Sequence, residues 1–220
     1  DFFRNEYLSP RSPYTTLQIP KQGIGEWCHP LHTVDINDAG LRSSVQNGIL
    51  NTELGIPFRT PAEGHNVAFT SLWDNYPDSL EIPLKGKASR AYLLMAGSTN
   101  HMQCHIDNGV IRIYYKDGTR DVMFLRNPDN WPPIEHIFFE DGLAFNRHTP
   151  ALYRLRLKTG EISNNFGEEL GFPGASRELD GGAAVLLEMP LNPGKKLSHL
   201  VLETLSNDVV IGLMSITLQR

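Results

Sequence analysis

The sequence predicts an all-β domain, built as an antiparallel β-sandwich or jelly roll. The main observation is a series of about ten short apolar or alternating runs, separated by Gly, Pro, Asn and Asp. The chain of 220 residues also contains 19 glycines and 15 prolines, which favour frequent turns over long helices. It shows neither a convincing amphipathic helical period nor an internal repeat. A barrel fits the same pattern, and the sequence does not separate the two architectures.

The N-terminal part lacks the periodicity of the rest. We expect residues 1–65 to form an irregular, extended segment that packs on the body formed by residues 66–220. The stretch Ser9-Pro10-Arg11-Ser12-Pro13 contains two prolines, which exclude a helix there. Short strands fit the sequence near 17–19, 33–36 and 56–58.

The pattern of strands begins after residue 66, with apolar runs at 67–70, 80–84 and 91–96. The clearest local signal comes next, where Asp107-Asn108-Gly109 separates the runs 101–106 and 110–115. Asn-Gly supplies the positive φ angles that a tight hairpin turn needs. A second turn is expected at Lys116-Asp117-Gly118-Thr119, before the run 121–125, so these three runs are predicted to form a meander.

Alternation supports the strand at 110–115, where Val110, Arg112 and Tyr114 would face one way and Ile111, Ile113 and Tyr115 the other. Two long loops are expected at 127–150 and 159–182. The remaining predicted strands are 152–157, 184–189, 197–204 and 209–218, with a turn at 206–208 between the last two.

Charge and hydropathy exclude two classes of partner. The net charge is -5 and there is no cluster of Lys and Arg, so we do not expect the chain to bind nucleic acid. The longest apolar runs are far shorter than a membrane span. The chain begins at Asp1 without a methionine, which suggests a segment of a longer protein whose export signal would lie upstream.

Several stretches resemble a known kind of module. The order of Leu80-Glu-Ile-Pro-Leu-Lys-Gly-Lys-Ala88, Ala91-Tyr-Leu-Leu-Met-Ala-Gly-Ser-Thr99, Tyr114-Tyr-Lys-Asp-Gly-Thr119 and Val210-Ile-Gly-Leu-Met-Ser-Ile-Thr-Leu218 resembles galactose-binding-like β-sandwiches of large bacterial glycoside hydrolases. Two further stretches, Tyr7-Leu-Ser-Pro-Arg-Ser-Pro-Tyr14 and Phe69-Thr-Ser-Leu-Trp-Asp-Asn-Tyr-Pro77, are similar to the C-terminal part of domain-of-unknown-function family 4450, from polysaccharide-degrading gut bacteria.

The resemblance implies a galactose-binding-like sandwich within a large exported protein, periplasmic or at the cell surface. An upstream catalytic domain, resembling an α/α-toroid glycosidase, would be its partner in the same polypeptide. The family offers no motif of catalytic residues to carry over onto this segment.

Sugar recognition is the first chemistry to consider, because sugars stack on aromatic rings while polar side chains bind their hydroxyls. The candidate carbohydrate-binding residues lie in loop-like segments and are Trp27, Trp73, Asp74, Tyr76, Asn130, Trp131 and His136. Trp131, between Asn130 and Pro132, is expected to carry an exposed ring. The alternative is that these rings cap the ends of the sandwich or dock the N-terminal segment.

Two small groups of Cys and His could meet in a zinc site, namely Cys28, His29 and His32 with His101, Cys104 and His105. Neither group has the paired cysteine spacing of a zinc finger, so a structural or surface role is favoured and no metal site is predicted. A disulfide between Cys28 and Cys104 is a separate alternative, which export would permit.

The segment from Asp35 to Gly40 resembles the start of an EF-hand loop, but Ala39 and Gln46 stand where the fifth and twelfth positions need oxygen ligands. We expect a turn there. A structural calcium ion held by backbone carbonyls would leave no sequence signature, and no other cofactor is predicted.

Three functions remain open. The first and favoured one is an ancillary module that binds carbohydrate or positions a neighbouring catalytic domain. The second is a module whose loops 127–150 and 159–182 complete the active site of the upstream domain. The third and least favoured is a self-contained hydrolase, which would need two converging acids from among Glu135, Glu140, Asp141, Glu168 and Glu169.

Overall fold

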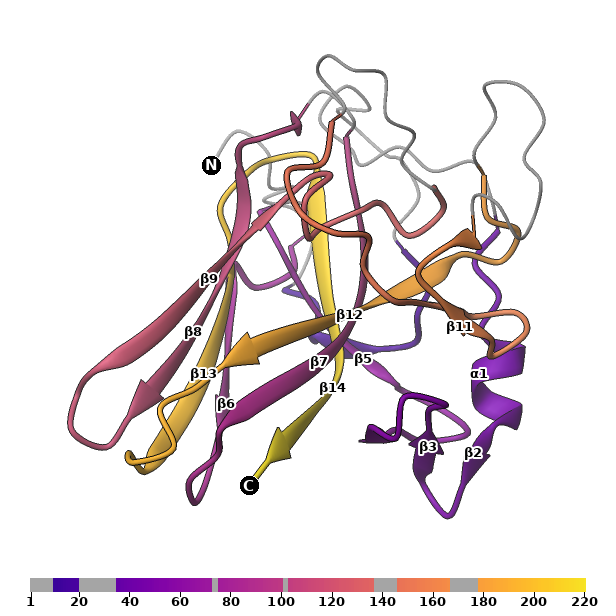
Figure 1. Ribbon diagram of the computed structural model, residues 1–220. Helices are drawn as coiled ribbons and strands as arrows, with labels where there is room; N and C mark the ends of the chain where they lie inside the picture. Colours follow the sequence, from indigo (N-terminus) through magenta and orange to yellow (C-terminus); the bar gives the residue numbers. More distant parts are fainter. Residues whose placement is uncertain (1–9, 20–34, 73–74, 101–102, 137–145, 167–177) are drawn as a thin grey trace.

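The computed structural model describes residues 10–19, 35–72, 75–100, 103–136, 146–166 and 178–220 (Figure 1). Its elements are β1 (Tyr14–Thr15), α1 (Ala39–Ser43), β2 (Val45–Gln46), β3 (Ile49–Asn51), β4 (Pro57–Arg59), β5 (Val67–Ser71), β6 (Ser79–Pro83), β7 (Arg90–Thr99), β8 (Asp107–Tyr115), β9 (Arg120–Arg126), β10 (Arg154–Arg156), β11 (Ile162–Ser163), β12 (Ala183–Pro190), β13 (Leu197–Thr204) and β14 (Val209–Gln219). Every pairing between these strands is antiparallel, which confirms the predicted fold class. The described residues contain no helix long and apolar enough to cross a bilayer, and α1 has only five residues.

Two large sheets form a sandwich. A seven-stranded sheet in the order β1-β5-β14-β7-β12-β10-β11 packs against a four-stranded sheet in the order β6-β13-β8-β9. Between them lies a buried core to which both sheets contribute alternate side chains, including Leu93, Met95, Leu187 and Ile211 from the large sheet and Ile111, Ile113, Leu200 and Leu202 from the small one. Burying each such side chain stabilises the fold by roughly 1.5–3 kcal/mol. The sheets keep separate edges, so the architecture is a sandwich and not a barrel.

The seven-stranded sheet is buried on its second face as well. Leu94, Leu186 and Val210 belong to a second core, on the opposite side of the sheet from Leu93, Leu187 and Ile211. This core is closed by side chains from the N-terminal part, namely Leu17, Leu41 of α1, Leu50 of β3 and Phe58 of β4. Burial on both faces explains why β7, β12 and β14 are almost continuously apolar in the sequence.

The N-terminal segment therefore has more structure than the sequence predicts. Within it, residues 35–65 hold α1 and the three-stranded sheet β2-β3-β4, so the expectation of an irregular segment is wrong for this stretch. The reason is a hairpin between β2 and β3, where Asn47 (φ 53°) and Gly48 (φ 75°) form the tight turn. The predicted strand at 56–58 overlaps β4, whereas residues 17–19 come after β1 and are not a strand.

The other Asn-Gly pair behaves differently, and the predicted turn at Asp107-Asn108-Gly109 is wrong. All three residues belong to β8, with a bulge at Asn108. The buried Asn108 side chain accepts a hydrogen bond from Thr99 Oγ1 (3.0 Å) and donates one to the Gln103 carbonyl (3.1 Å). A Cβ on Gly109 would lie 2.2 Å from Cδ1 of Ile211, so this glycine allows the two sheets to approach each other.

Most other strand predictions are confirmed within a residue or two, including β5, β6, β12, β13 and β14, whereas β7 continues three residues beyond its predicted end. The hairpin between β8 and β9 is also confirmed, with Gly118 at φ 82° and the Asp117 carboxylate accepting hydrogen bonds from Thr119. The predicted meander of three strands is wrong, because the described residues 103–106 of its first run do not form a strand and only the β8–β9 hairpin remains. In the predicted strand at 152–157 only β10 forms, and the short β11 lies inside the predicted loop 159–182.

Candidate functional site

The predicted sugar-stacking rings that the structure describes are buried. Trp131 is fully buried in the core between the two sheets, so the expectation of an exposed ring is wrong. The physical reason is Gly97 of β7: a Cβ there would lie 2.7 Å from Cζ2 of Trp131, so the indole occupies the space that the glycine leaves. Tyr76 is also buried and belongs to the second core. Its ring packs edge-to-face against that of Phe69, with 5.7 Å between the ring centroids. The two rings thus lie in different cores and cannot form one binding face.

Asn130 and His136 are placed by local contacts. The Asn130 side chain accepts a hydrogen bond from the Arg126 amide (2.7 Å) and donates one to the Phe124 carbonyl (2.8 Å), so its amide group closes the turn after β9. His136 is partly exposed, and its Nε2 lies 4.0 Å from Oε1 of the buried Glu135. Trp27, Trp73 and Asp74 lie outside the described residues and stay predictions.

A buried arginine holds the loop that comes after Trp131. The Arg154 guanidinium is completely buried and donates hydrogen bonds to the carbonyls of Pro133 (2.8 Å) and Ala183 (3.1 Å), and also to those of Ile134 and His136. Burial lowers the pKa of Arg154 to about 9, which leaves the side chain charged at neutral pH. These contacts fix the predicted loop residues 133–136 to β12, and they make this stretch part of the rigid body.

The segment from Asp35 to Gly40 forms the predicted turn into α1. Oδ2 of Asp38 accepts hydrogen bonds from Arg42 Nε (2.9 Å) and Asn66 Nδ2 (2.7 Å), and Oδ1 of Asn37 accepts one from the Ala39 amide. Of the two Cys and His groups, Cys28, His29, His32 and His101 lie outside the described residues, so the disulfide with Cys104 stays a prediction. Cys104 itself accepts a hydrogen bond from Asn127 at 3.6 Å.

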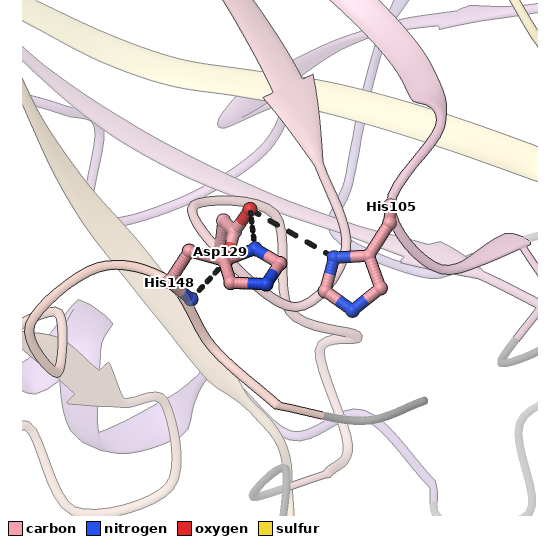
Figure 2. Close-up of side chains that lie close together, drawn as sticks. All are labelled: His105, Asp129 and His148. Carbon is pink, nitrogen blue, oxygen red and sulfur yellow. Dashed lines mark hydrogen bonds and ion pairs between the residues drawn. The ribbon is translucent and has the colours of Figure 1, made fainter. Parts of the chain in front are cut away.

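The structure brings together three side chains that the sequence analysis did not group: His105, Asp129 and His148 (Figure 2). His105 lies two residues before the start of β8, Asp129 lies in the turn after β9, and His148 lies before β10. The start of β8 and the end of β9 lie at the same end of the sandwich, at the top of Figure 1.

The geometry of this cluster is set by the Asp129 carboxylate. Its Oδ2 lies 3.4 Å from His148 Nδ1 and 4.0 Å from His105 Nδ1, and its Oδ1 accepts a hydrogen bond from the His148 backbone amide (2.6 Å). The two imidazole rings lie 4.6 Å apart between centroids, tilted by 45°. Imidazole nitrogen and carboxylate oxygen are ligands of zinc and related metals, so these are residues that could hold such an ion.

The outer face of the four-stranded sheet is the second candidate surface. Arg112 of β8 forms an ion pair with Glu203 of β13, while Tyr114 stacks on His199 with 4.7 Å between ring centroids. The Arg120 guanidinium of β9 lies 5.7 Å from the centroid of the Tyr114 ring and donates a hydrogen bond to its hydroxyl (3.0 Å). On the edge strand β9, Val122 is 42% exposed and Phe124 is 43% exposed. The face therefore combines charged groups of both signs with exposed apolar side chains.

No protein-family model, curated protein or solved structure matches this chain. Its function is therefore inferred from the arrangement of its side chains.

Proposed function

We propose that the chain is an ancillary carbohydrate-binding β-sandwich module of a larger exported protein related to glycoside hydrolases, and that it binds glycan on the outer face of the four-stranded sheet. The observation that supports this surface is an exposed aromatic ring, Phe124, on the same sheet face as the Arg112–Glu203 ion pair. The resemblance of the sequence to modules of large glycoside hydrolases supports the class of ligand and the upstream catalytic partner.

The chemistry of the face suits a polar ligand with apolar patches. A sugar ring buries its C–H face on an aromatic ring, and its hydroxyls bind planar charged side chains such as Arg and Glu. Phe124, Val110 and Glu203 lie directly opposite one another on three adjacent strands. Since neighbouring strands lie about 4.8 Å apart, Phe124 and Glu203 are separated by roughly 10 Å across the face. An extended ligand can thus contact the ring and the ion pair together.

The contacts of Tyr114 restrict which ring can stack on a sugar. Its ring stacks on His199, and the Arg120 guanidinium lies 5.7 Å from the ring centroid. A sugar would need to displace His199 to stack on that face, whereas the Phe124 ring has no stacked aromatic partner among the described residues and, with the Arg126 guanidinium 5.6 Å from its centroid, is still 43% exposed. We therefore assign the stacking role to Phe124, in place of the buried Trp131 and Tyr76.

Affinity electrophoresis through gels containing soluble polysaccharides, with a glycan array to find the ligand, tests this proposal. Replacing Phe124 by Ala should weaken binding roughly 3- to 10-fold, because one stacking contact contributes about 0.5–1.5 kcal/mol. Tyr14→Ala is the matched control, since Tyr14 is an exposed aromatic residue (57%) on an edge strand of the other sheet. Absence of binding to any glycan, or equal loss of binding in both variants, would contradict the proposed surface.

A further inference from the structure

The cluster of His105, Asp129 and His148 is independent of the glycan surface and needs its own explanation. The three side chains come from three separate parts of the chain, and their ligand atoms all lie within 4.8 Å of one another. We propose that they bind a divalent transition-metal ion, with zinc as the preferred ion.

The distances between the Asp129 carboxylate and the two rings are long for hydrogen bonds. Good hydrogen bonds between nitrogen and oxygen measure about 2.7–3.2 Å. Oδ2 of Asp129 lies 3.4 Å from His148 Nδ1 and 4.0 Å from His105 Nδ1, so neither imidazole is bonded tightly to it. In a tetrahedral zinc site, bonds of about 2.1 Å place the ligand atoms about 3.4 Å from one another. The Asp129–His148 pair already has this spacing and the Asp129–His105 pair is about 0.6 Å wider. All three ligand atoms lie within 4.8 Å of one another, so an ion would draw them closer together.

The exposure of the three side chains permits this small closure. The Asp129 side chain is 15% exposed and that of His105 is 30% exposed, whereas the His148 side chain is 69% exposed. Asp129 and His105 thus form the less exposed part of the site, and the His148 ring lies on its solvent side. An exposed ligand also leaves a path by which an ion can enter from solvent.

Supporting contacts orient the carboxylate, as is usual around metal ligands. Oδ1 of Asp129 is held by the His148 backbone amide at 2.6 Å, which turns Oδ2 toward the two rings. The Asp129 carbonyl accepts a hydrogen bond from Thr149 Oγ1 (2.7 Å), and the His105 amide donates to the Asn127 carbonyl (2.7 Å). The neighbouring cation, Arg126, forms its ion pair with Asp107 at 2.6 Å, and Asp129 acts on its charge more weakly.

The donor set selects the class of metal. Calcium and magnesium prefer sites built entirely from oxygen, whereas two imidazoles with one carboxylate suit zinc and its neighbours in the first transition series. Three protein ligands leave one coordination position for water or an external ligand, as in zinc sites that are not purely structural.

Isothermal titration of the full chain, freed of metal with a chelator, tests the proposal with zinc chloride as the probe. We expect one zinc ion per chain, no heat with calcium chloride, and at least a tenfold loss of zinc affinity in Asp129→Asn and in His148→Ala. His65→Ala is the matched control, since His65 is an exposed histidine outside the cluster, and it should bind zinc as the parent protein does.

A second readout separates loss of the site from loss of folding. The metal-free melting temperature of His148→Ala should equal that of the parent protein, because this side chain is mostly exposed. Zinc should raise the melting temperature of the parent protein but not that of the variant. Absence of zinc binding, or zinc binding that persists unchanged in both cluster variants, would overturn the proposal. The second result would place the ion on other side chains.

Discussion

Replacing Trp131 by alanine separates a packing role for this ring from a sugar-binding role. The side chain is fully buried between the two sheets and packs against Gly97. A tryptophan buries about 150–250 Å², which at about 25 cal/mol per Å² corresponds to roughly 4–6 kcal/mol. Large-to-small substitutions of buried aromatic residues cost about 3–5 kcal/mol. We therefore expect Trp131→Ala to lower the free energy of unfolding by about 4 kcal/mol.

Trp131→Phe provides the graded comparison. Phenylalanine keeps much of the buried ring and removes the indole N–H, for which the described part of the chain offers no hydrogen-bond acceptor. The loss of one ring is then partly offset by removal of an unsatisfied buried donor, and we expect a cost of about 1–2 kcal/mol. Urea unfolding measured by circular dichroism gives both values. If Trp131→Ala instead lost glycan binding while its stability changed by less than about 0.5 kcal/mol, the value expected for a surface site, our account of this residue would be refuted.

Two further predictions concern the hairpin and the approach of the sheets. Gly109→Ala should destabilise the protein by about 1–3 kcal/mol in urea unfolding, because the new methyl group would meet Ile211 and the Glu203 carbonyl; an unchanged midpoint would contradict the close approach. Asp117 has its pKa lowered to about 2, first by hydrogen bonds from Thr119 and then by Lys195. Because the folded-state pKa lies below the ordinary value of 3.8, its stabilising effect is complete above pH 4 and is lost as the pH falls toward 2. Asp117→Asn should accordingly reduce the slope of stability against pH between 4 and 2, and an identical slope in both proteins would show that the carboxylate contributes nothing.

The sequence predicted strands correctly where the alternation of apolar and polar residues and the flanking turn residues indicated the same boundaries. Turn chemistry alone was insufficient, because Asn47-Gly48 and Asn108-Gly109 are the same dipeptide and only the first forms a turn. Tertiary contacts determine the conformation of Asn108-Gly109. Asn108 accepts a hydrogen bond from Thr99, and Gly109 faces Ile211 across the sandwich. A local window contains neither partner, so the dipeptide alone predicted a hairpin that does not form.

The candidate sites were harder to predict from the sequence, because they also depend on residues that are distant along the chain. Trp131 lies among prolines and asparagines that are typical of exposed loops, but its burial depends on Gly97 in a distant strand. His105 was considered only with its sequence neighbours, whereas its spatial neighbours are Asp129 and His148. Ligands on separate loops have no fixed spacing, so no pattern in the sequence could have joined these three residues.

The covering of both faces of the large sheet has a practical consequence for any attempt to isolate this module. A fragment that begins at residue 66 would expose Leu94, Leu186 and Val210 to water, since Leu17, Leu41 and Phe58 now shield them. Such a fragment would present a broad sheet of branched apolar side chains, which favours self-association. The described residues before 66, which are 10–19 and 35–65, thus form a third layer of the body, and fusions or truncations of this protein should retain them.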